Sequence, residues 1–101
     1  MSAFNEKVWK IITKIPKGKV TTYKHVAHAL NTRAYRAVGT ALSKNPDAPI
    51  VPCHRIVNSD GRIGNYSGGD GTITKIALLK QEGIEFENGK VKNLSKVLYT
   101  F

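Results

Sequence analysis

The chain has 101 residues, of which 41% are hydrophobic, and a single cysteine, Cys53. This length fits one domain with a modest core, and a lone cysteine excludes an internal disulfide. No apolar run reaches the roughly 20 residues of a membrane span, and no segment has the layout of a signal peptide. Sixteen Lys and Arg against seven Asp and Glu give a formal charge of +9. This charge favours nucleic acid as the partner, although a basic chain that is merely soluble is the alternative. We expect a cytoplasmic, nucleoid-associated protein that makes no membrane contact.

Three amphipathic helices are predicted in the first 45 residues. The pattern of FNEKVWKIITKIPKGK predicts a helix that ends at Pro16 and Gly18. Thr22 can cap a second helix, YKHVAHAL, which ends near Asn31, and AYRAVGTALSK predicts a third that stops before Pro46. The second and third helices form a helix-turn-helix. The positions predicted to be buried are Phe4, Val8, Ile11, Ile12 and Ile15, then Val26, Ala27 and Leu30, then Ala34, Ala37, Val38, Ala41 and Leu42.

Beyond Pro46 the sequence becomes rich in prolines and turns. DAPIVPCHRIV predicts an extended segment, because proline is excluded from helix interiors. IVNSDGRI predicts a small hairpin at its Asp-Gly turn, and NYSGGDG predicts a glycine-rich loop. TITKIALLKQEG predicts a last helix, capped by Thr72 or Asp70 and terminated by Gly83. IEFENGKV predicts a hairpin around its Asn-Gly pair. The expected fold class is therefore mostly α with short β-hairpins.

The thiol of Cys53 lies in the stretch IVPCHRIVN, next to a proline, a histidine and an arginine. A free cysteine is most often an inert core residue. Nucleophilic chemistry needs a thiolate, and a thiolate needs a base, a donor or a cation nearby, which His54 and Arg55 can supply. Neighbouring side chains of an extended segment point to opposite faces, so a contact between Cys53 and His54 needs a bend or a bridging water. The pattern favours a nucleophile.

Metal binding is not expected from this sequence. His25 and His28 stand at i, i+3 without the third ligand that a zinc site needs, and a solvated helix face is the simpler interpretation. The loop NYSGGDG lacks the Lys-Ser/Thr end of a phosphate-binding loop. Its glycines are expected to let the backbone approach a ligand closely.

Three stretches together, RAVGTALSKNP, VPCHRIVNSDGRIGNYSGG and LLKQEG, resemble the active-site and DNA-binding domain of the O6-alkylguanine-DNA alkyltransferases, also called methylated-DNA protein-cysteine methyltransferases. The Pro-Cys-His-Arg signature carries most of the specificity, and the resemblance runs from about residue 3 to residue 92. It implies a winged helix-turn-helix-like single domain over residues 1–101, without the separate N-terminal domain of many members.

The resemblance implies that Cys53 attacks the alkyl carbon on guanine O6 and keeps the group as a thioether. Each chain would then react once, as a suicide methyltransferase without a cofactor. His54 resembles the base that takes the thiol proton through a water, and Glu82 resembles the carboxylate that orients it. Asn45 resembles the hinge between the recognition helix and the active-site strand. Whether O4-alkylthymine is a second substrate is left open.

The same resemblance implies base flipping, because O6 lies inside a stacked duplex. Arg36 resembles the arginine that enters the stack in place of the flipped base, and Tyr23 resembles the tyrosine that contacts that base. Tyr66 and Ser67 resemble the loop that lines the guanine pocket, and Lys75 resembles a lysine that stabilises the leaving guanine. The implied minor-groove contacts are made by Thr22, Tyr23, Tyr35, Arg36, Ala37 and Gly39.

Three features depart from the family pattern. Tyr35 stands where a small residue often faces the minor groove, SGGDGTIT is longer than the usual loop before the last helix, and the turn between the DNA-binding helices is short. The expected partner is double-stranded DNA containing O6-alkylguanine, bound by a monomer. Two alternatives stay open. One is a non-enzymatic lesion binder of the alkyltransferase-like type, although those proteins replace the cysteine. The other is a winged-helix regulator in which the signature is chance.

Overall fold

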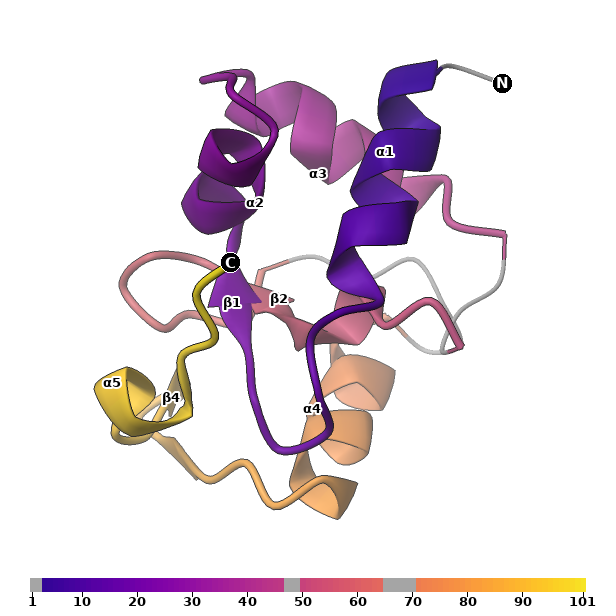
Figure 1. Cartoon of the computed structure of the whole chain (residues 1–101). Helices are drawn as coiled ribbons and strands as arrows, with labels where there is room; N and C mark the ends of the chain where they lie inside the picture. Colours follow the sequence, from indigo (N-terminus) through magenta and orange to yellow (C-terminus); the bar gives the residue numbers. More distant parts are fainter. Residues whose placement is uncertain (1–2, 47–49, 65–70) are drawn as a thin grey trace.

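A pair of short parallel strands lies at the middle of the molecule, with helices on both sides of it (Figure 1). The computed structural model describes residues 3–46, 50–64 and 71–101. In chain order the elements are α1 (Ala3–Ile12), β1 (Thr21–Thr22), α2 (Tyr23–Ala29), α3 (Tyr35–Ser43), the 3₁₀ helix η1 (Cys53–Arg55), β2 (Ile56–Val57), α4 (Thr72–Gln81), β3 (Phe86–Glu87), β4 (Lys90–Val91) and α5 (Leu94–Val97).

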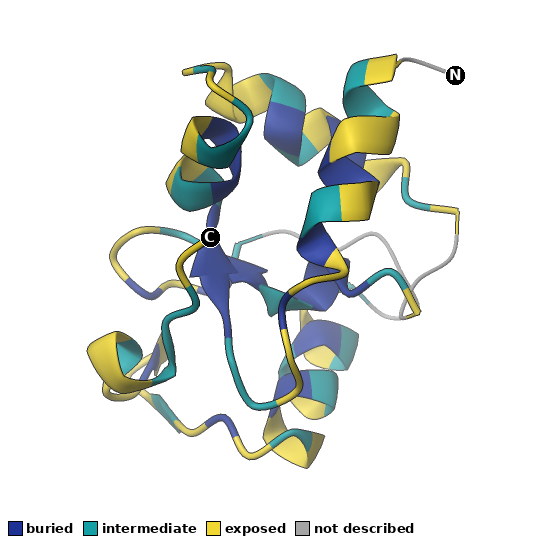
Figure 2. Ribbon diagram, in the orientation of Figure 1, coloured by how far each residue is buried: buried dark blue, intermediate teal, exposed yellow. Residues whose placement is uncertain are grey.

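The helices α1, α2 and α3 form the larger core on one side of the strand pair. Their apolar faces turn toward one another, as the burial colours show (Figure 2). Trp9 lies in this core, and its indole Nε1 donates to the carbonyl oxygen of Ala41 at 2.7 Å. This bond ties α1 to the last part of α3. The fully buried helix residues of the cluster are Val8, Ile12, Val26, Ala27, Val38 and Ala41.

The parallel strands β1 and β2 bring two distant parts of the chain together. Thr21 pairs with Ile56, and Thr22 pairs with Val57. Parallel pairing requires a long crossover, and here α2, α3 and η1 provide it. The C-terminal segment lies beside the residue that precedes β1, where the Tyr99 amide donates to the Val20 carbonyl at 2.6 Å. The pairing places the start of α2 close to the residues that precede β2.

A smaller core lies on the opposite side of the strands, between α4 and the β3–β4 hairpin (Figure 1). The hairpin predicted at the Asn-Gly pair is confirmed, with Asn88 and Gly89 both at positive φ. Gly83, at φ +91°, follows the end of α4 as predicted. The buried residues of this core are Val20, Val57, Leu79, Ile84 and Val91.

The helices of the first half match the sequence prediction in number and order. Thr22 caps α2, since its hydroxyl oxygen accepts from the His25 amide at 3.1 Å. α1 ends at Ile12, earlier than predicted, and hydrogen-bonded turns carry the chain on to Ile15. Ala34 is exposed, contrary to prediction, because it precedes α3 rather than lying in it. In the described ranges no helix has the length and apolarity of a membrane span.

Three local predictions after Pro46 are wrong. The Asp-Gly turn does form, with the Asn58 amide donating to Arg62 at 2.9 Å, but β2 pairs with β1 and Arg62 bridges to Lys90, so there is no local hairpin. Cys53–Arg55 is a 3₁₀ turn rather than extended backbone. Gly71 occupies the N-cap of α4 without a side-chain hydrogen bond, and Asp70 lies outside the described residues. In the first case strand pairing overrode the local pattern, and in the second the Arg55 amide closes a local turn on the Pro52 carbonyl at 3.0 Å.

Candidate active site

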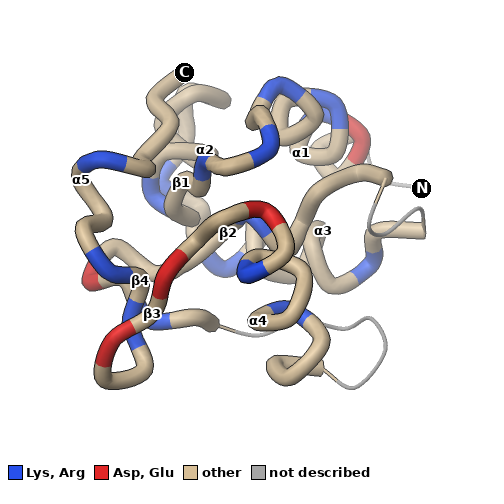
Figure 3. Tube along the Cα trace, turned by 90° about the horizontal axis from the view of Figure 1, so that it is seen from below, with Lys and Arg blue, Asp and Glu red and all other residues tan. Residues whose placement is uncertain are grey.

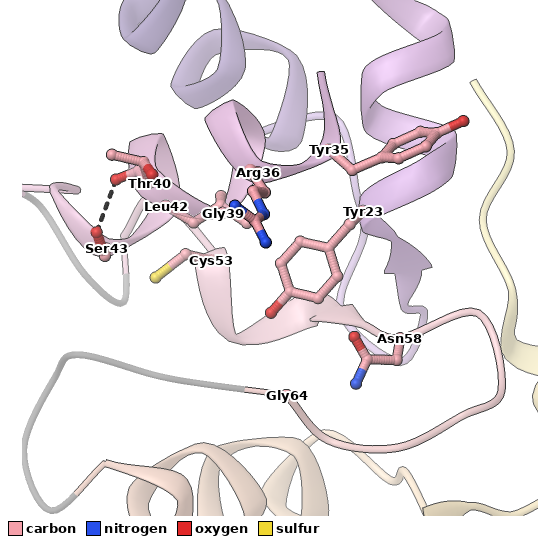
Figure 4. Close-up of a pocket in the computed structure, with 10 residues that line it drawn as sticks. All are labelled: Tyr23, Tyr35, Arg36, Gly39, Thr40, Leu42, Ser43, Cys53, Asn58 and Gly64. Atoms are coloured by element: carbon pink, nitrogen blue, oxygen red, sulfur yellow. Dashed lines mark hydrogen bonds between the residues drawn. The ribbon is translucent and has the colours of Figure 1, made fainter. Parts of the chain in front are cut away.

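A cavity of about 760 Å³ opens between α3 and residues 58–64 (Figure 4). Cys53 lies in its wall with only 4% of its surface exposed, and Tyr23 and Arg36 extend into the same space. Small-ligand sites usually measure about 300–1,000 Å³, so the cavity has room for a nucleobase. The described lining residues are Tyr23, Tyr35, Arg36, Gly39, Thr40, Leu42, Ser43, Cys53, Asn58 and Gly64.

The 3₁₀ turn fixes the position of the Cys53 thiol. The Cys53 amide donates to the Val51 carbonyl at 2.8 Å, and the Asn45 side-chain nitrogen donates to the same carbonyl at 2.7 Å. Asn45 therefore joins the end of α3 to the segment that carries the thiol. Burial raises the pKa of the Cys53 thiol above its ordinary value, against the opposing effects of an Asn45 hydrogen bond and the Lys75 charge. The resting thiol is neutral and needs a base.

His54 contacts Glu82, the residue that follows α4 and the partner expected from the sequence. Its Nε2 lies 3.0 Å from Glu82 Oε2, and the imidazole is only 2% exposed. A carboxylate accepts and cannot donate, so Nε2 carries the proton and Nδ1 keeps its lone pair. Nδ1 is buried and has no hydrogen-bond partner in the described part of the chain. Burial lowers the pKa of His54, although Glu82 acts in the opposite direction. The imidazole is thus a neutral base with one free nitrogen.

Arg55 has a role that the sequence did not reveal. Its guanidinium binds Glu82 through two bonds, Nε to Oε1 at 2.8 Å and Nη2 to Oε2 at 2.6 Å. A third bond runs from Nη1 to the Ile15 carbonyl at 2.8 Å. Burial alone would raise the pKa of Glu82, but the hydrogen bonds from Arg55 and His54 outweigh it and hold that pKa low. Arg55 therefore orients the Glu82 carboxylate. This corrects the expectation that its positive charge acts directly on the Cys53 thiol.

Lys75 is fully buried on α4. Its Nζ donates to the Ile56 carbonyl at 2.5 Å and lies 6.0 Å from the centre of the Tyr23 ring. Desolvation lowers the pKa of Lys75 to about 8, and the negative charge of an ionised Cys53 opposes this effect. Near neutral pH the ammonium is thus still charged, and it is electrostatically coupled to the thiol. The sequence predicted its involvement in the site but not its complete burial.

Gly64 and Tyr23 are packed closely enough to favour glycine at position 64. A Cβ built on Gly64 would lie 2.7 Å from the Tyr23 hydroxyl oxygen, and Gly64 has φ +74°. A side chain at this position would therefore be strained. The close approach of backbone and phenol defines one edge of the cavity (Figure 4). Residues 65–70 of the glycine-rich loop NYSGGDG lie outside the described residues.

The remaining residues predicted to bind DNA or guanine lie at different places in the structure. Tyr35, Arg36 and Gly39 line the cavity, and Arg36 is exposed at its mouth. Ala37 is half-buried and does not line the cavity. Thr22 is only 2% exposed, and its hydroxyl serves as the α2 cap. Tyr66 and Ser67 lie outside the described residues.

Five lining residues were not predicted as site residues: Thr40, Leu42, Ser43, Asn58 and Gly64. Spacing on α3 could have indicated two of them, Thr40 and Ser43, since both follow Arg36 on the same helix face. Asn58 lies at the cavity because it follows β2, and the pairing of β2 with β1 cannot be predicted from the neighbouring sequence. Among the described residues, no three His, Cys, Asp or Glu side chains lie close enough to hold a metal ion.

The positive charge is concentrated in the first half of the chain. Residues 1–46 contain nine of the sixteen Lys and Arg but only one of the seven Asp and Glu, so they carry +8 of the net +9. No acidic residue occurs on α2 or α3, the helices beside the cavity mouth (Figure 3). A polyanion is therefore favoured on this side of the molecule.

Comparison with known proteins places the site in a family context. Residues 3–84 match the family described as 6-O-methylguanine DNA methyltransferase, DNA binding domain. A methylated-DNA–protein-cysteine methyltransferase of Saccharolobus islandicus is 51% identical over 82 residues, which are 81% of this chain and 52% of the relative. The chain thus spans about half the length of this curated relative.

Two solved structures have the same fold. M. tuberculosis OGT in complex with DNA superposes with a TM-score of 0.78 at 39% identity, over 82% of this chain and 50% of that one. S. pombe Atl1, bound to damaged DNA containing O6-carboxymethylguanine, superposes with a TM-score of 0.85 at 31% identity, over 100% of this chain and 98% of that one. The mostly helical, winged helix-turn-helix-like fold class is confirmed. The chain belongs to the 6-O-methylguanine DNA methyltransferase family, of which it contains the DNA-binding domain.

Proposed function

We propose that this protein repairs O6-alkylguanine in double-stranded DNA by moving the alkyl group, once and irreversibly, onto Cys53. The observation that carries the proposal is the position of Cys53 in the wall of a nucleobase-sized cavity that also contains Tyr23 and Arg36. A cysteine that only filled the core would not need such a cavity. Family membership supports alkylated guanine as the base that enters it.

In the proposed reaction the Cys53 sulfur attacks the alkyl carbon, the bond from that carbon to guanine O6 breaks, and its electron pair stays on the base. The thiol proton passes through a water to Nδ1 of His54 and finally to the guanine, so atoms and charge balance. Glu82 keeps Nδ1 free for this transfer, because it holds the imidazole proton on Nε2. The product thioether is a poor leaving group, so each chain reacts once and needs no cofactor.

Lys75 and Asn45 supply the electrostatic support for this step. Both lower the pKa of Cys53, and they therefore stabilise the thiolate that burial disfavours. As the carbon–oxygen bond breaks, negative charge moves from sulfur to the guanine, and the Lys75 ammonium also stabilises this leaving group. A buried cation is worth more here than in water, because the local dielectric constant is low.

Base flipping would deliver the alkylated guanine to the thiol. Arg36 is exposed at the cavity mouth and takes the place of the flipped base in the stack, while Tyr23 contacts that base inside. Tyr35, Ala37 and Gly39 contribute to the minor-groove contact around them. Tyr66 and Ser67 are assigned to guanine binding on the family resemblance alone.

The proposed setting is a reducing compartment, because a nucleophilic thiol must stay reduced to function. We therefore assign the protein to the cytoplasm, on nucleoid DNA. It acts as a monomer, since the proposed catalytic groups Cys53, His54, Glu82 and Lys75 all come from one chain.

Lesion binding without transfer is the second candidate function. One observation favours it: the similarity to S. pombe Atl1 extends over the whole of both chains. Cys53 favours transfer instead, because the thiol lies in the cavity wall and has a neutral histidine beside it. The two functions make different predictions for what happens after the lesion is bound.

The substitution Cys53→Ser separates them. Three measurements are needed on wild type and variant: thermal unfolding, affinity for a methylguanine duplex at a stated salt concentration, and transfer of a labelled methyl group. The proposal predicts that fold and affinity survive, because phosphate contacts supply most of the affinity, and that transfer is lost. A wild type that binds the lesion but never accepts the methyl group would support lesion binding. A variant that unfolds would support a packing role for Cys53.

A further inference from the structure

We propose that the turn between α2 and α3 holds a binding site for one DNA backbone phosphate, and that His28 couples this site to the cavity through Tyr35. The site is a pocket of about 330 Å³ lined by His28, Asn31, Thr32 and Arg33. The inference rests on the proposed function, since the lesion-bearing duplex is its ligand.

The turn presents hydrogen-bond donors that have no acceptor within the described chain. The amides of Asn31, Thr32, Ala34 and Tyr35 all bind internal acceptors, whereas that of Arg33 has no such partner in the described residues. The Arg33 guanidinium is exposed and likewise makes no ion pair there. The Thr32 hydroxyl oxygen accepts from the Ala34 amide at 3.1 Å, which leaves its hydrogen free to donate. An oxyanion with several acceptor atoms matches these donors.

The helix-turn-helix that forms the pocket contains no acidic residue. The acidic residues nearest in sequence to Arg33 are Glu6 and Asp47, and neither α2 nor α3 contains one. An arginine on a protein surface usually finds a carboxylate or stays solvated, and a whole helix-turn-helix without carboxylates favours an external anion. In a DNA-binding domain that anion is a backbone phosphate, because phosphate contacts fix the register of the protein on the duplex.

His28 connects this pocket to the cavity. Its Nε2 lies 3.2 Å from the Tyr35 hydroxyl oxygen, and the two rings are tilted at 56° with centroids 6.0 Å apart. When Tyr35 donates to Nε2, Nδ1 carries the imidazole hydrogen and can donate it to a phosphate oxygen in the pocket. Tyr35 lines the cavity that contains Cys53, so one hydrogen bond links the two sites.

This link explains how the helix accommodates a large residue at its first position. Tyr35 is 41% exposed, and its ring points away from Cys53 and the centre of the cavity (Figure 4). The bond to His28 holds the ring toward α2, beside Arg36 but out of the path to the thiol. Binding of a phosphate at His28 and Arg33 would fix this arrangement when the duplex arrives. His28 and Arg33 are thus positioning residues for Tyr35 and for the DNA.

The test uses duplexes in which single phosphates around a methylguanine are replaced, one at a time, by neutral methylphosphonates. Binding is measured from 50 to 200 mM salt for wild type, Arg33→Gln, His28→Phe and the control Lys80→Gln. Lys80 is an exposed cation on α4 that lines neither pocket. One lost phosphate contact lowers the salt slope by about 0.9, so the affinity ratio between the two salt concentrations should shrink about threefold to fourfold for Arg33→Gln.

The proposal predicts that one methylphosphonate position weakens wild type and Lys80→Gln but no longer weakens Arg33→Gln. Coupling through Tyr35 predicts that His28→Phe and Tyr35→Phe are non-additive, since each removes the same hydrogen bond. An unchanged salt slope in Arg33→Gln, or equal losses at every position in all proteins, would overturn the phosphate site. Additive losses would overturn the coupling. Methyl transfer to wild type from a free alkylguanine base, which has no phosphate, tests the proposed function separately.

Discussion

Glu82 holds Arg55 in a two-pronged ion pair, with Nε to Oε1 at 2.8 Å and Nη2 to Oε2 at 2.6 Å, and the two side chains are only 16% and 11% exposed. This ion pair joins η1 to the end of α4. Because the same carboxylate accepts from His54, the geometry of the proposed base depends on a residue that never reaches the cavity.

The substitution Arg55→Lys keeps the charge but loses the fork that matches a carboxylate. We expect a loss of about 2–3 kcal/mol in the free energy of unfolding, since breaking a buried pair costs about 3–5 kcal/mol and lysine restores part of it. The control is Arg62→Lys. Arg62 pairs with Asp60 at 3.3 Å on an exposed surface, and such pairs contribute only about 0–1 kcal/mol. Chemical denaturation of both variants measures the difference, and equal losses would contradict a structural role for the Arg55 pair.

The pH dependence of methyl transfer should reveal His54 as the base. Burial holds the pKa of His54 below 6.5, so the imidazole is neutral at pH 7 and becomes protonated only on further acidification. We expect a rate that falls as the pH drops below 6.5, because protonated His54 cannot accept the thiol proton. Glu82→Gln can donate an amide hydrogen to Nε2 and so favour the wrong tautomer, which should slow transfer about 100-fold or more. An acid limb centred above pH 6.5, or a Glu82→Gln variant of normal rate, would refute this assignment.

Lys75 should reduce stability at neutral pH while it serves the reaction. Its pKa is lowered from 10.5 to about 8, so the folded state binds fewer protons than the unfolded state between these values. Stability should therefore rise as the pH increases from 8 to 10.5, by about 3 kcal/mol from this group alone. The raised pKa of Cys53 acts in the opposite direction above pH 9, which makes a difference measurement necessary.

The comparison is between wild type and Lys75→Met, by denaturation at pH 7, 8, 9 and 10. Methionine fills a similar volume without a charge. The free energy of unfolding of wild type should therefore increase relative to that of the variant as the pH rises. The variant should also transfer methyl groups more slowly, because it lacks the cation that stabilises the thiolate. A stability difference that is independent of pH would show that Lys75 carries no desolvation penalty.

Arg36 should affect the rate of repair of duplex DNA but not the rate of reaction with a free base. If its guanidinium replaces the flipped nucleotide, Arg36→Ala should slow repair of a methylguanine duplex about tenfold or more, since unstacking costs a few kcal/mol. Reaction with free O6-alkylguanine, which is already unstacked, should change little. Lys10→Ala, at an exposed position of α1, controls for the loss of one positive charge. Equal losses on both substrates would place Arg36 in the chemistry or the fold instead.

The sequence was most informative where local chemistry decides structure. The Thr22 cap, the Gly83 terminator and the Asn-Gly hairpin each follow from a short pattern whose geometry is intrinsic to the residues. Helical periodicity likewise located α1, α2 and α3. The roles proposed for Cys53, His54 and Glu82 come from the motif resemblance, and the structure brings His54 and Glu82 into hydrogen-bond contact.

The features that were missed depend on contacts between distant residues. Arg55 and Glu82 are 27 positions apart, and nothing near Arg55 identifies its partner. β1 and β2 have two residues each, too few for a periodic signal, and their parallel pairing is set by the helices between them. Lys75 lies on a helix face where burial of a lysine contradicts its usual preference. Packing that overrides local preference is expected where function requires it.

Mass spectrometry of the intact protein after reaction with a duplex that contains one methylguanine tests the central claim most directly. The account predicts that the chain gains the mass of one methyl group, that peptide mapping places it on Cys53, and that further duplex adds nothing. The duplex should then contain ordinary guanine in equal amount. Continued turnover beyond one equivalent, a methyl group on another residue, or an unmodified protein bound to an unrepaired duplex would contradict irreversible transfer to Cys53.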